Sequence, residues 1–229
     1  MTELDIRNAI IAAMSRTTTW ASSTFIPEMF VDKFTRRADL VVAGNNKLIV
    51  FEIKSERDKL DRLDGQLKSY IRFFEQVTVV CAERHLEGVK ANSLSEVGIW
   101  AIRKDGSIRK VRKAKSLDQC STDSWLSFLP VDELRKLLKM HNMKLGRHRH
   151  DLLAAADNIP MKAIRKYVLD YLQRRDERIQ ERVGKKGQGQ AATPPSIEEY
   201  LKTLAQRPMK AIPRTRPHSS KPSPSLSPA

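Results

Sequence analysis

Apolar residues in the first half of the chain follow two different periods, and each period predicts a different element. Apolar positions at helical spacing over residues 4–15 and 60–74 predict two helices. Short β-branched apolar runs predict strands at 25–31, 40–44, 47–51, 77–83, 97–104 and 107–114. Strands mixed with helices in this way predict an α/β domain over residues 1–115, with a mixed sheet flanked by helices.

Helical patterns dominate the second half. Residues 129–143, 146–160 and 161–183 read as helices of a small basic domain over 124–183, behind a polar linker at 115–124. From residue 184 the composition becomes rich in Gly, Gln, Ala and Pro, which predicts a flexible linker. An isolated helix is expected at 196–206, as a candidate contact for a protein partner, before a basic, proline-rich and disordered end.

The hairpin around Gly44-Asn45-Asn46 carries the candidate chemistry. Asp39 opens its first strand, while Glu52 and Lys54 close its second. Side chains alternate along a strand, so Glu52 and Lys54 share a face and Ile53 points the other way, into the core. Asp39 on the partner strand can then lie beside Glu52. Two carboxylates on an apolar sheet need a compensating cation, and Mg²⁺ (or Mn²⁺) is suited to oxygen ligands where phosphate is the substrate.

This pattern resembles the PD-(D/E)XK nuclease superfamily, whose restriction-endonuclease-like fold carries an Asp, a hairpin and a Glu-x-Lys. Arg37-Ala38-Asp39 stands where the superfamily name has Pro-Asp. Gln66 and Tyr70 match the Gln-x-x-x-Tyr element of one branch, and Glu28 sits where many members place a further acidic residue. The stretch 52–74 is similar to a group of bacterial and phage proteins known mainly from sequence. The resemblance covers roughly residues 1–115.

The resemblance implies a metal-dependent nuclease acting on DNA, in DNA processing, repair or phage and mobile-element biology. Asp39 and Glu52 would hold Mg²⁺ or Mn²⁺, with the Ile53 carbonyl as a further ligand, and Lys54 would stabilise developing charge or position water. Gln66 and Tyr70 would orient nucleic acid or support Lys54, and Glu28 would be an additional carboxylate. Two alternatives stay open: an inactive nucleic-acid-binding protein that kept the fold, and a scaffold whose basic tail recruits acidic partners.

Charge distribution agrees with a nucleic-acid partner. The net charge is +15, yet residues 1–95 hold 14 Lys and Arg against 13 Asp and Glu, whereas residues 184–229 hold 8 against 2. Basic flanks around a nearly neutral domain suit binding to a phosphate backbone, although they can also serve solubility. Candidate contacts are Arg37, Lys110, Arg112, Arg147 and Arg149. The basic strand at 107–114 is equally well explained as an edge strand protected against aggregation.

The helical segment has two interpretations. The pattern from Leu129 to Leu153 is loosely similar to SAP-type modules that bind DNA, while a helical cap on the α/β core explains it equally well. Two cysteines at unrelated positions predict neither a disulfide framework nor a zinc site. No apolar run reaches the length of a membrane span and no secretory signal pattern is present, so we expect a cytoplasmic protein without membrane contact.

Overall fold

A computed structural model of the chain describes residues 1–32, 35–117 and 120–187. It contains a six-stranded mixed sheet with helices on both faces and a helical segment after it, which confirms the predicted fold class. The elements are α1 (Glu3–Ser15), β1 (Thr24–Val31), β2 (Arg36–Gly44), β3 (Lys47–Lys54), α2 (Leu63–Phe73), β4 (Gln76–Ala82), the 3-10 turn η1 (Glu83–His85), α3 (Leu86–Ala91), β5 (Gly98–Ile102), β6 (Ile108–Arg112), α4 (Thr122–Ser127), α5 (Val131–Met140), α6 (Arg149–Ala156) and α7 (Met161–Gly187).

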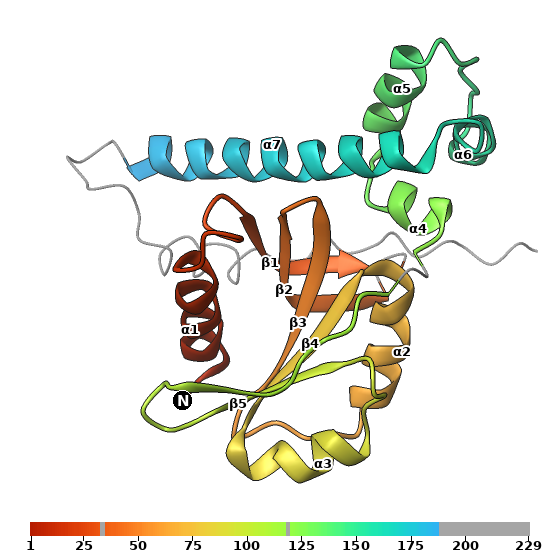
Figure 1. Ribbon diagram of the computed structural model, residues 1–229. Coiled ribbons are helices and arrows are strands. Elements are labelled where there is room, and N and C mark those ends of the chain that lie inside the picture. Colours follow the sequence, from red (N-terminus) through yellow and green to blue (C-terminus); the bar gives the residue numbers. More distant parts are fainter. Residues whose placement is uncertain (33–34, 118–119, 188–229) are drawn as a thin grey trace, which may run out of the picture.

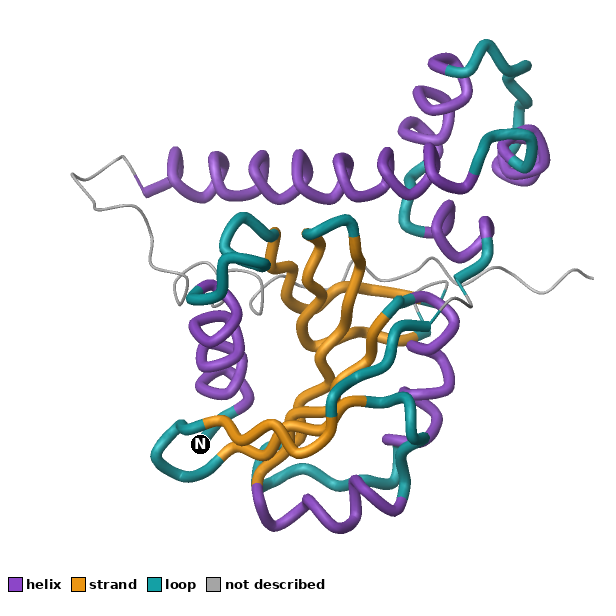
Figure 2. Tube along the Cα trace, viewed as in Figure 1, coloured by secondary structure: helices purple, strands orange, loops and turns teal. Residues whose placement is uncertain are grey.

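The strands lie in the sheet in the order in which they occur in the chain. Strands β1, β2 and β3 form an antiparallel meander, β3, β4 and β5 run parallel, and β6 returns antiparallel at the edge. Parallel neighbours need a crossover, and α2 and α3 supply the two crossovers (Figure 2). The candidate residues of β2, β3 and α2 are therefore close in space because β3 leads directly into α2.

Two turns between strands have positive φ values at asparagine or glycine residues. Asn45 and Asn46 have φ values of 48° and 56°, so a two-residue turn with left-handed backbone joins the Gly44–Lys47 pair. That conformation matches the right-handed twist of the flanking strands, and asparagine tolerates it well. Gly106 likewise has a φ of 83° between β5 and β6. The hairpin expected around Gly44-Asn45-Asn46 is thus confirmed, and β5 and β6 form a second one.

Each face of the sheet has its own hydrophobic cluster. Helix α1 covers one face, where Ile6 and Ile10 pack with Leu40, Phe51 and Ile53. Its start is fixed by a capping box between Thr2 and Asp5. Ile53 therefore points away from the face that carries Glu52 and Lys54, as the strand alternation predicts.

Helices α2 and α3 pack on the other face, α7 contacts β1 and β2, and α4 contacts α2 and α7; their apolar residues belong to one continuous cluster with the sheet. Helix α7 runs across the end of the sheet where β2 joins β3, while α5 and α6 extend away from it (Figure 1). Arg165 of α7 donates to the Asn46 carbonyl, pairs with Glu75 and stacks over Trp125. The contacts of α4 and α7 favour the cap interpretation for these two helices.

Some boundaries differ from the expected ones. Helix α7 includes residues 184–187, which we expected to belong to the linker; a glycine costs a helix only about 1 kcal/mol, so composition alone did not mark its end. Helix α4 begins within the expected linker, capped by Ser121. The predicted helix at 196–206 and the basic tail lie outside the described residues. Among the described helices, none is long and apolar enough to cross a membrane.

Candidate functional site

A local irregularity in the β1–β2 pair positions two carboxylates. Glu28 and Asp39 lie opposite each other, and the two strands keep the same register on both sides of them. Glu28 has a φ of 53°, a backbone conformation that residues other than glycine rarely adopt. Ile26 and Met29, three residues apart, belong to the same cluster, although residues on one face of a regular strand are two apart. The strand therefore turns over at Glu28, and such strained positions concentrate at functional sites.

Asp39 also marks the end of the β2–β3 ladder. The last backbone pair before it joins Leu40 to Phe51. Beyond that pair, the Asp39 carboxylate accepts a hydrogen bond from the Ile53 N–H, at 2.7 Å. The side chain thus replaces the backbone acceptor that a continuing strand would provide. This bond fixes Asp39 next to the start of the Glu52-Ile53-Lys54 segment.

Glu52 and Lys54 form a buried polar network with α2. Lys54 Nζ lies 2.7 Å from Glu52 Oε1 and donates a second bond to Gln66 Oε1 at 3.0 Å. The Tyr70 hydroxyl donates to Glu52 Oε2 at 2.9 Å and lies 3.1 Å from the Arg37 carbonyl. Gln66 and Tyr70 are one helical turn apart, so α2 presents both to the same strand. The structure brings the predicted Glu-x-Lys and Gln-x-x-x-Tyr residues together.

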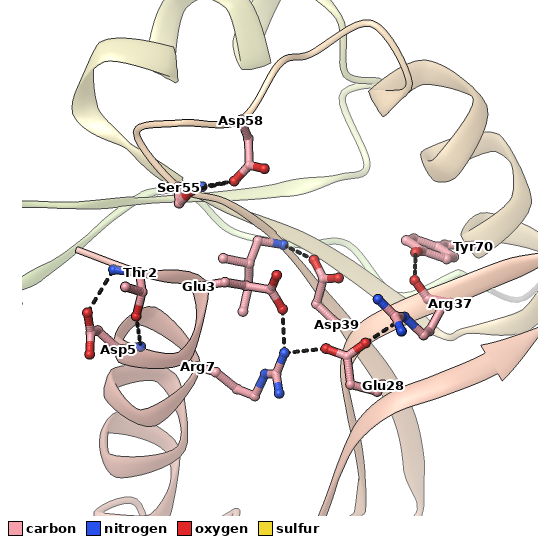
Figure 3. A network of polar contacts seen from close by, with 11 residues as sticks. Thr2, Glu3, Asp5, Arg7, Glu28, Arg37, Asp39, Ser55, Asp58 and Tyr70 are labelled. Atoms are coloured by element: carbon pink, nitrogen blue, oxygen red, sulfur yellow. Dashed lines mark hydrogen bonds and ion pairs between the residues drawn. The ribbon is translucent and has the colours of Figure 1, made fainter. Parts of the chain in front are cut away.

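A second group of charges lies on the α1 side of Asp39 (Figure 3). Carboxylate oxygens of Glu3, Glu28 and Asp39 lie within 4.8 Å of one another. The Arg7 guanidinium contacts both Glu3 and Glu28, and Arg37 Nε lies 2.6 Å from the other oxygen of Glu28. Glu28 therefore lies beside Asp39 and is contacted by Arg7 of α1 and Arg37 of β2.

Burial disfavours the charged form of these carboxylates. It raises the pKa of Asp39 well above its usual range, and the neighbouring Glu52 raises it further, against the Ile53 N–H and Lys54. Burial also raises the pKa of Glu52, although Lys54 and Tyr70 favour its ionised form. The pKa of Glu28 is raised by burial too, against Arg7 and Arg37. A cation bound among these groups would relieve part of this cost.

The predicted nucleic-acid contacts are found in two kinds of environment. Arg112 donates to the Val97 and Leu94 carbonyls and to a serine, and Arg149 donates to two carbonyls at the end of α4, so both hold loops in place. Arg37, Lys110 and Arg147 are exposed, with Lys110 over the Trp100 ring. The second group is the better placed to meet a phosphate.

Comparison with known proteins adds a family. Residues 1–199 match the family described as Bacteriophage P4 protein cII. The chain belongs to the phage P4 cII family. Protein cII of Enterobacteria phage P4 is 33% identical over 178 residues, which make up 76% of this chain and 67% of that protein. Among solved structures, the SPO1766 protein of unknown function from Silicibacter pomeroyi has a TM-score of 0.42 at 15% identity, covering 62% of this chain and 93% of that one.

The match to the cII family spans every element from α1 to α7. The network of Glu52 and Lys54 with α2 and the group of charges on the α1 side of Asp39 therefore both lie inside the matched region. Two site residues of this cII-family chain, Glu3 and Arg7, were not predicted from the sequence. Arg7 lies on the buried stripe of α1, one turn from Ile10 and Ile11. An arginine in an apolar stripe requires a buried acidic partner, and that signal could have revealed the contact with Glu28.

Proposed function

We propose that this cII-family protein is a metal-dependent nuclease that hydrolyses phosphodiester bonds of DNA. The observation that carries the proposal is the buried network in which Lys54 bridges Glu52 and Gln66 beside Asp39. A scaffold has no need for a buried lysine and glutamate beside the half-buried Asp39 and Gln66, because charged and polar groups are costly to remove from water. The same four residues carry the resemblance to the PD-(D/E)XK superfamily.

The residues present fit a hard divalent cation. Carboxylate oxygens of Glu3 and Glu28 lie within 4.8 Å of a carboxylate oxygen of Asp39, such oxygens are the ligands that Mg²⁺ and Mn²⁺ prefer, and burial makes the negative charge of Asp39 costly. Asp39 and Glu52 are the ligands we assign, with the Ile53 carbonyl as a third donor and Glu28 as a supporting carboxylate. Once bound, such a cation supplies Lewis acidity at the scissile phosphate.

The protein's own groups would perform the remaining steps. Lys54, held by Glu52 and Gln66, is a fixed positive charge that can stabilise negative charge developing on the phosphate oxygens. Burial raises the pKa of Tyr70, which therefore stays protonated and keeps donating to Glu52. Gln66 and Tyr70 are positioning residues in this assignment, because they act through Lys54 and Glu52.

Double-stranded or single-stranded DNA would bind through exposed basic side chains. Arg37 lies beside the acidic group with its side chain 58% exposed, so it can reach a phosphate next to the reacting one. Lys110 and Arg147 are exposed farther along the chain, on β6 and before α6. The dependence of affinity on salt would report how many such contacts form.

An inactive DNA-binding protein that keeps this fold is the second candidate. The observation in its favour is that the carboxylates are already paired: both Glu52 oxygens accept bonds, and Arg7 contacts Glu3 and Glu28. A protein that had lost its metal would benefit from such internal compensation. Cleavage activity separates the two candidates.

The test is a cleavage panel of linear, circular, single-stranded and branched DNA with Mg²⁺ or Mn²⁺. Glu52→Gln should abolish cleavage while DNA binding persists. Glu133→Gln is the matched control, because Glu133 is also a buried glutamate with a tyrosine and a lysine partner, Tyr167 and Lys136, yet lies outside the site. Loss of activity in Glu52→Gln with full activity in Glu133→Gln supports the proposal. No metal-dependent cleavage of any substrate by the wild type supports the inactive alternative.

A further inference from the structure

Arg7 is the most buried cation of the acidic group. Its side chain is 6% exposed, and its guanidinium contacts carboxylates from two elements, Glu3 of its own helix and Glu28 of the irregular strand β1. Its Nε atom is buried without a hydrogen-bond partner. A buried arginine is tolerated only where its charge is balanced, so Arg7 is held there by the carboxylates of the site.

The second cation that contacts Glu28, Arg37, differs from Arg7 in being exposed to solvent. Arg37 pairs with the second oxygen of Glu28, but its side chain is 58% exposed and its charge is screened by water. Asp39, the third carboxylate of the group, has no ion pair among the described residues and accepts a hydrogen bond from the Ile53 N–H. In the acidic group, arginine ion pairs thus compensate the negative charges of Glu3 and Glu28, whereas the carboxylate of Asp39 has no such compensation.

We propose that the Arg7 guanidinium compensates the negative charges of Glu3 and Glu28 in place of a metal ion, so that the site binds a single divalent ion, at Asp39. The inference rests on the proposed function, in which Asp39 helps to hold a metal. Arg7 is a positioning residue here: it fixes Glu28 through a contact between α1 and β1, and its charge repels a second ion. Removing the charge would leave Glu3 and Glu28 free to join Asp39 as ligands.

The experiment counts Mn²⁺ ions by isothermal titration calorimetry on the full-length protein, without DNA. The wild type should bind one Mn²⁺ per chain. Arg7→Gln should bind two, or bind one ion at least tenfold more tightly, a change of about 1.4 kcal/mol. Arg7→Lys keeps the charge and should bind one ion as the wild type does. Arg37→Gln, which removes an exposed charge from the same glutamate, should change the affinity less than Arg7→Gln.

Glu3→Gln keeps the inference testable if Arg7→Gln fails to fold, because Glu3 is half-exposed at the start of α1. In the wild-type background it should leave the count at one ion and weaken binding less than Asp39→Asn. Three results would each overturn the role of Arg7. They are abolished Mn²⁺ binding in Glu3→Gln, binding of two ions by the wild type, and identical titrations of wild type and Arg7→Gln. Absence of Mn²⁺ binding in wild type and Arg7→Gln alike would instead overturn the metal site of the proposed function.

Discussion

Replacing Tyr70 with Phe removes one hydroxyl from the centre of the buried network and leaves the ring packing intact. Tyr70 is fully buried, and its hydroxyl donates to Glu52 Oε2 at 2.9 Å. Glu52 is 1% exposed, so water cannot replace the lost donor. A buried hydrogen bond to a charged group is worth about 1.5–3 kcal/mol, and we expect a loss of about 2 kcal/mol. For a chain of this size, that loss lowers the Tm by about 4–8 °C.

The pH dependence of this loss has a definite sign. The Tyr70 bond favours the ionised form of Glu52, and burial holds the pKa of Glu52 above its ordinary value. Its contribution is therefore largest at high pH and shrinks as the pH falls through the raised pKa of Glu52, because a protonated carboxyl accepts a weaker bond. Thermal unfolding of wild type and Tyr70→Phe at pH 8 and near pH 5 measures it.

Tyr167→Phe is the matched control for this variant. Tyr167 donates to Glu133 Oε2, also at 2.9 Å, but Glu133 keeps Lys136 and Arg174 as further partners. We expect a loss of about 1 kcal/mol and unchanged cleavage, whereas Tyr70→Phe should also lower cleavage by about 10- to 100-fold through the displaced Glu52. Equal Tm values for wild type and Tyr70→Phe at pH 8, or a difference that grows on acidification, would refute the reasoning.

Three further predictions address the metal carboxylate, the lysine and the helical segment. Asp39→Asn should raise the free energy of unfolding at pH 8 without metal, because the pKa of Asp39 is raised in the folded state. This gain in stability should vanish as the pH falls toward about 4, near the pKa of an unfolded aspartate. Urea titrations that show a constant gain across that pH range would contradict the prediction. Lys54→Ala should lower the single-turnover cleavage rate by about 10²–10³-fold with little change in DNA affinity; the reverse pattern would make Lys54 a binding residue. Truncation after residue 117 should expose the apolar surface of α2, β1 and β2 that α4 and α7 contact and give insoluble protein, whereas a chain of residues 1–187 should stay soluble. A soluble, cooperatively folded 1–117 fragment would show that the helices form a separate domain.

The sequence predicted most of the site because its signals are local. Asp39, Glu52 and Lys54 lie on two strands joined by a two-residue turn, so strand alternation alone places them together. Gln66 and Tyr70 follow on the next helix with one-turn spacing, and only one crossover separates them from β3. Short-range patterns of this kind survive in the folded protein because the intervening chain is too short to allow other arrangements.

The contacts of α1 with the site could not be predicted in the same way. Glu3 and Arg7 meet Glu28 across the fold, and the turned-over backbone at Glu28 breaks the alternation on which strand predictions rest. Helices α3 and α4 are six residues each, too short for an apolar period to stand out. The packing of α7 on the sheet, and of α4 on α2 and α7, depends on complementary surfaces, which leave no local pattern in the sequence.

In the proposed function, Asp39, Glu52 and Lys54 form one metal-dependent cleavage site. The most direct measurement is single-turnover cleavage of a labelled linear DNA duplex with Mn²⁺, by wild type, Glu52→Gln and the control Glu133→Gln, under conditions where all three bind the DNA fully. We expect cleavage by the wild type and by Glu133→Gln, no cleavage by Glu52→Gln, and no cleavage by any of them with excess chelator. Equal cleavage rates for wild type and Glu52→Gln, or cleavage that persists with chelator, would contradict it.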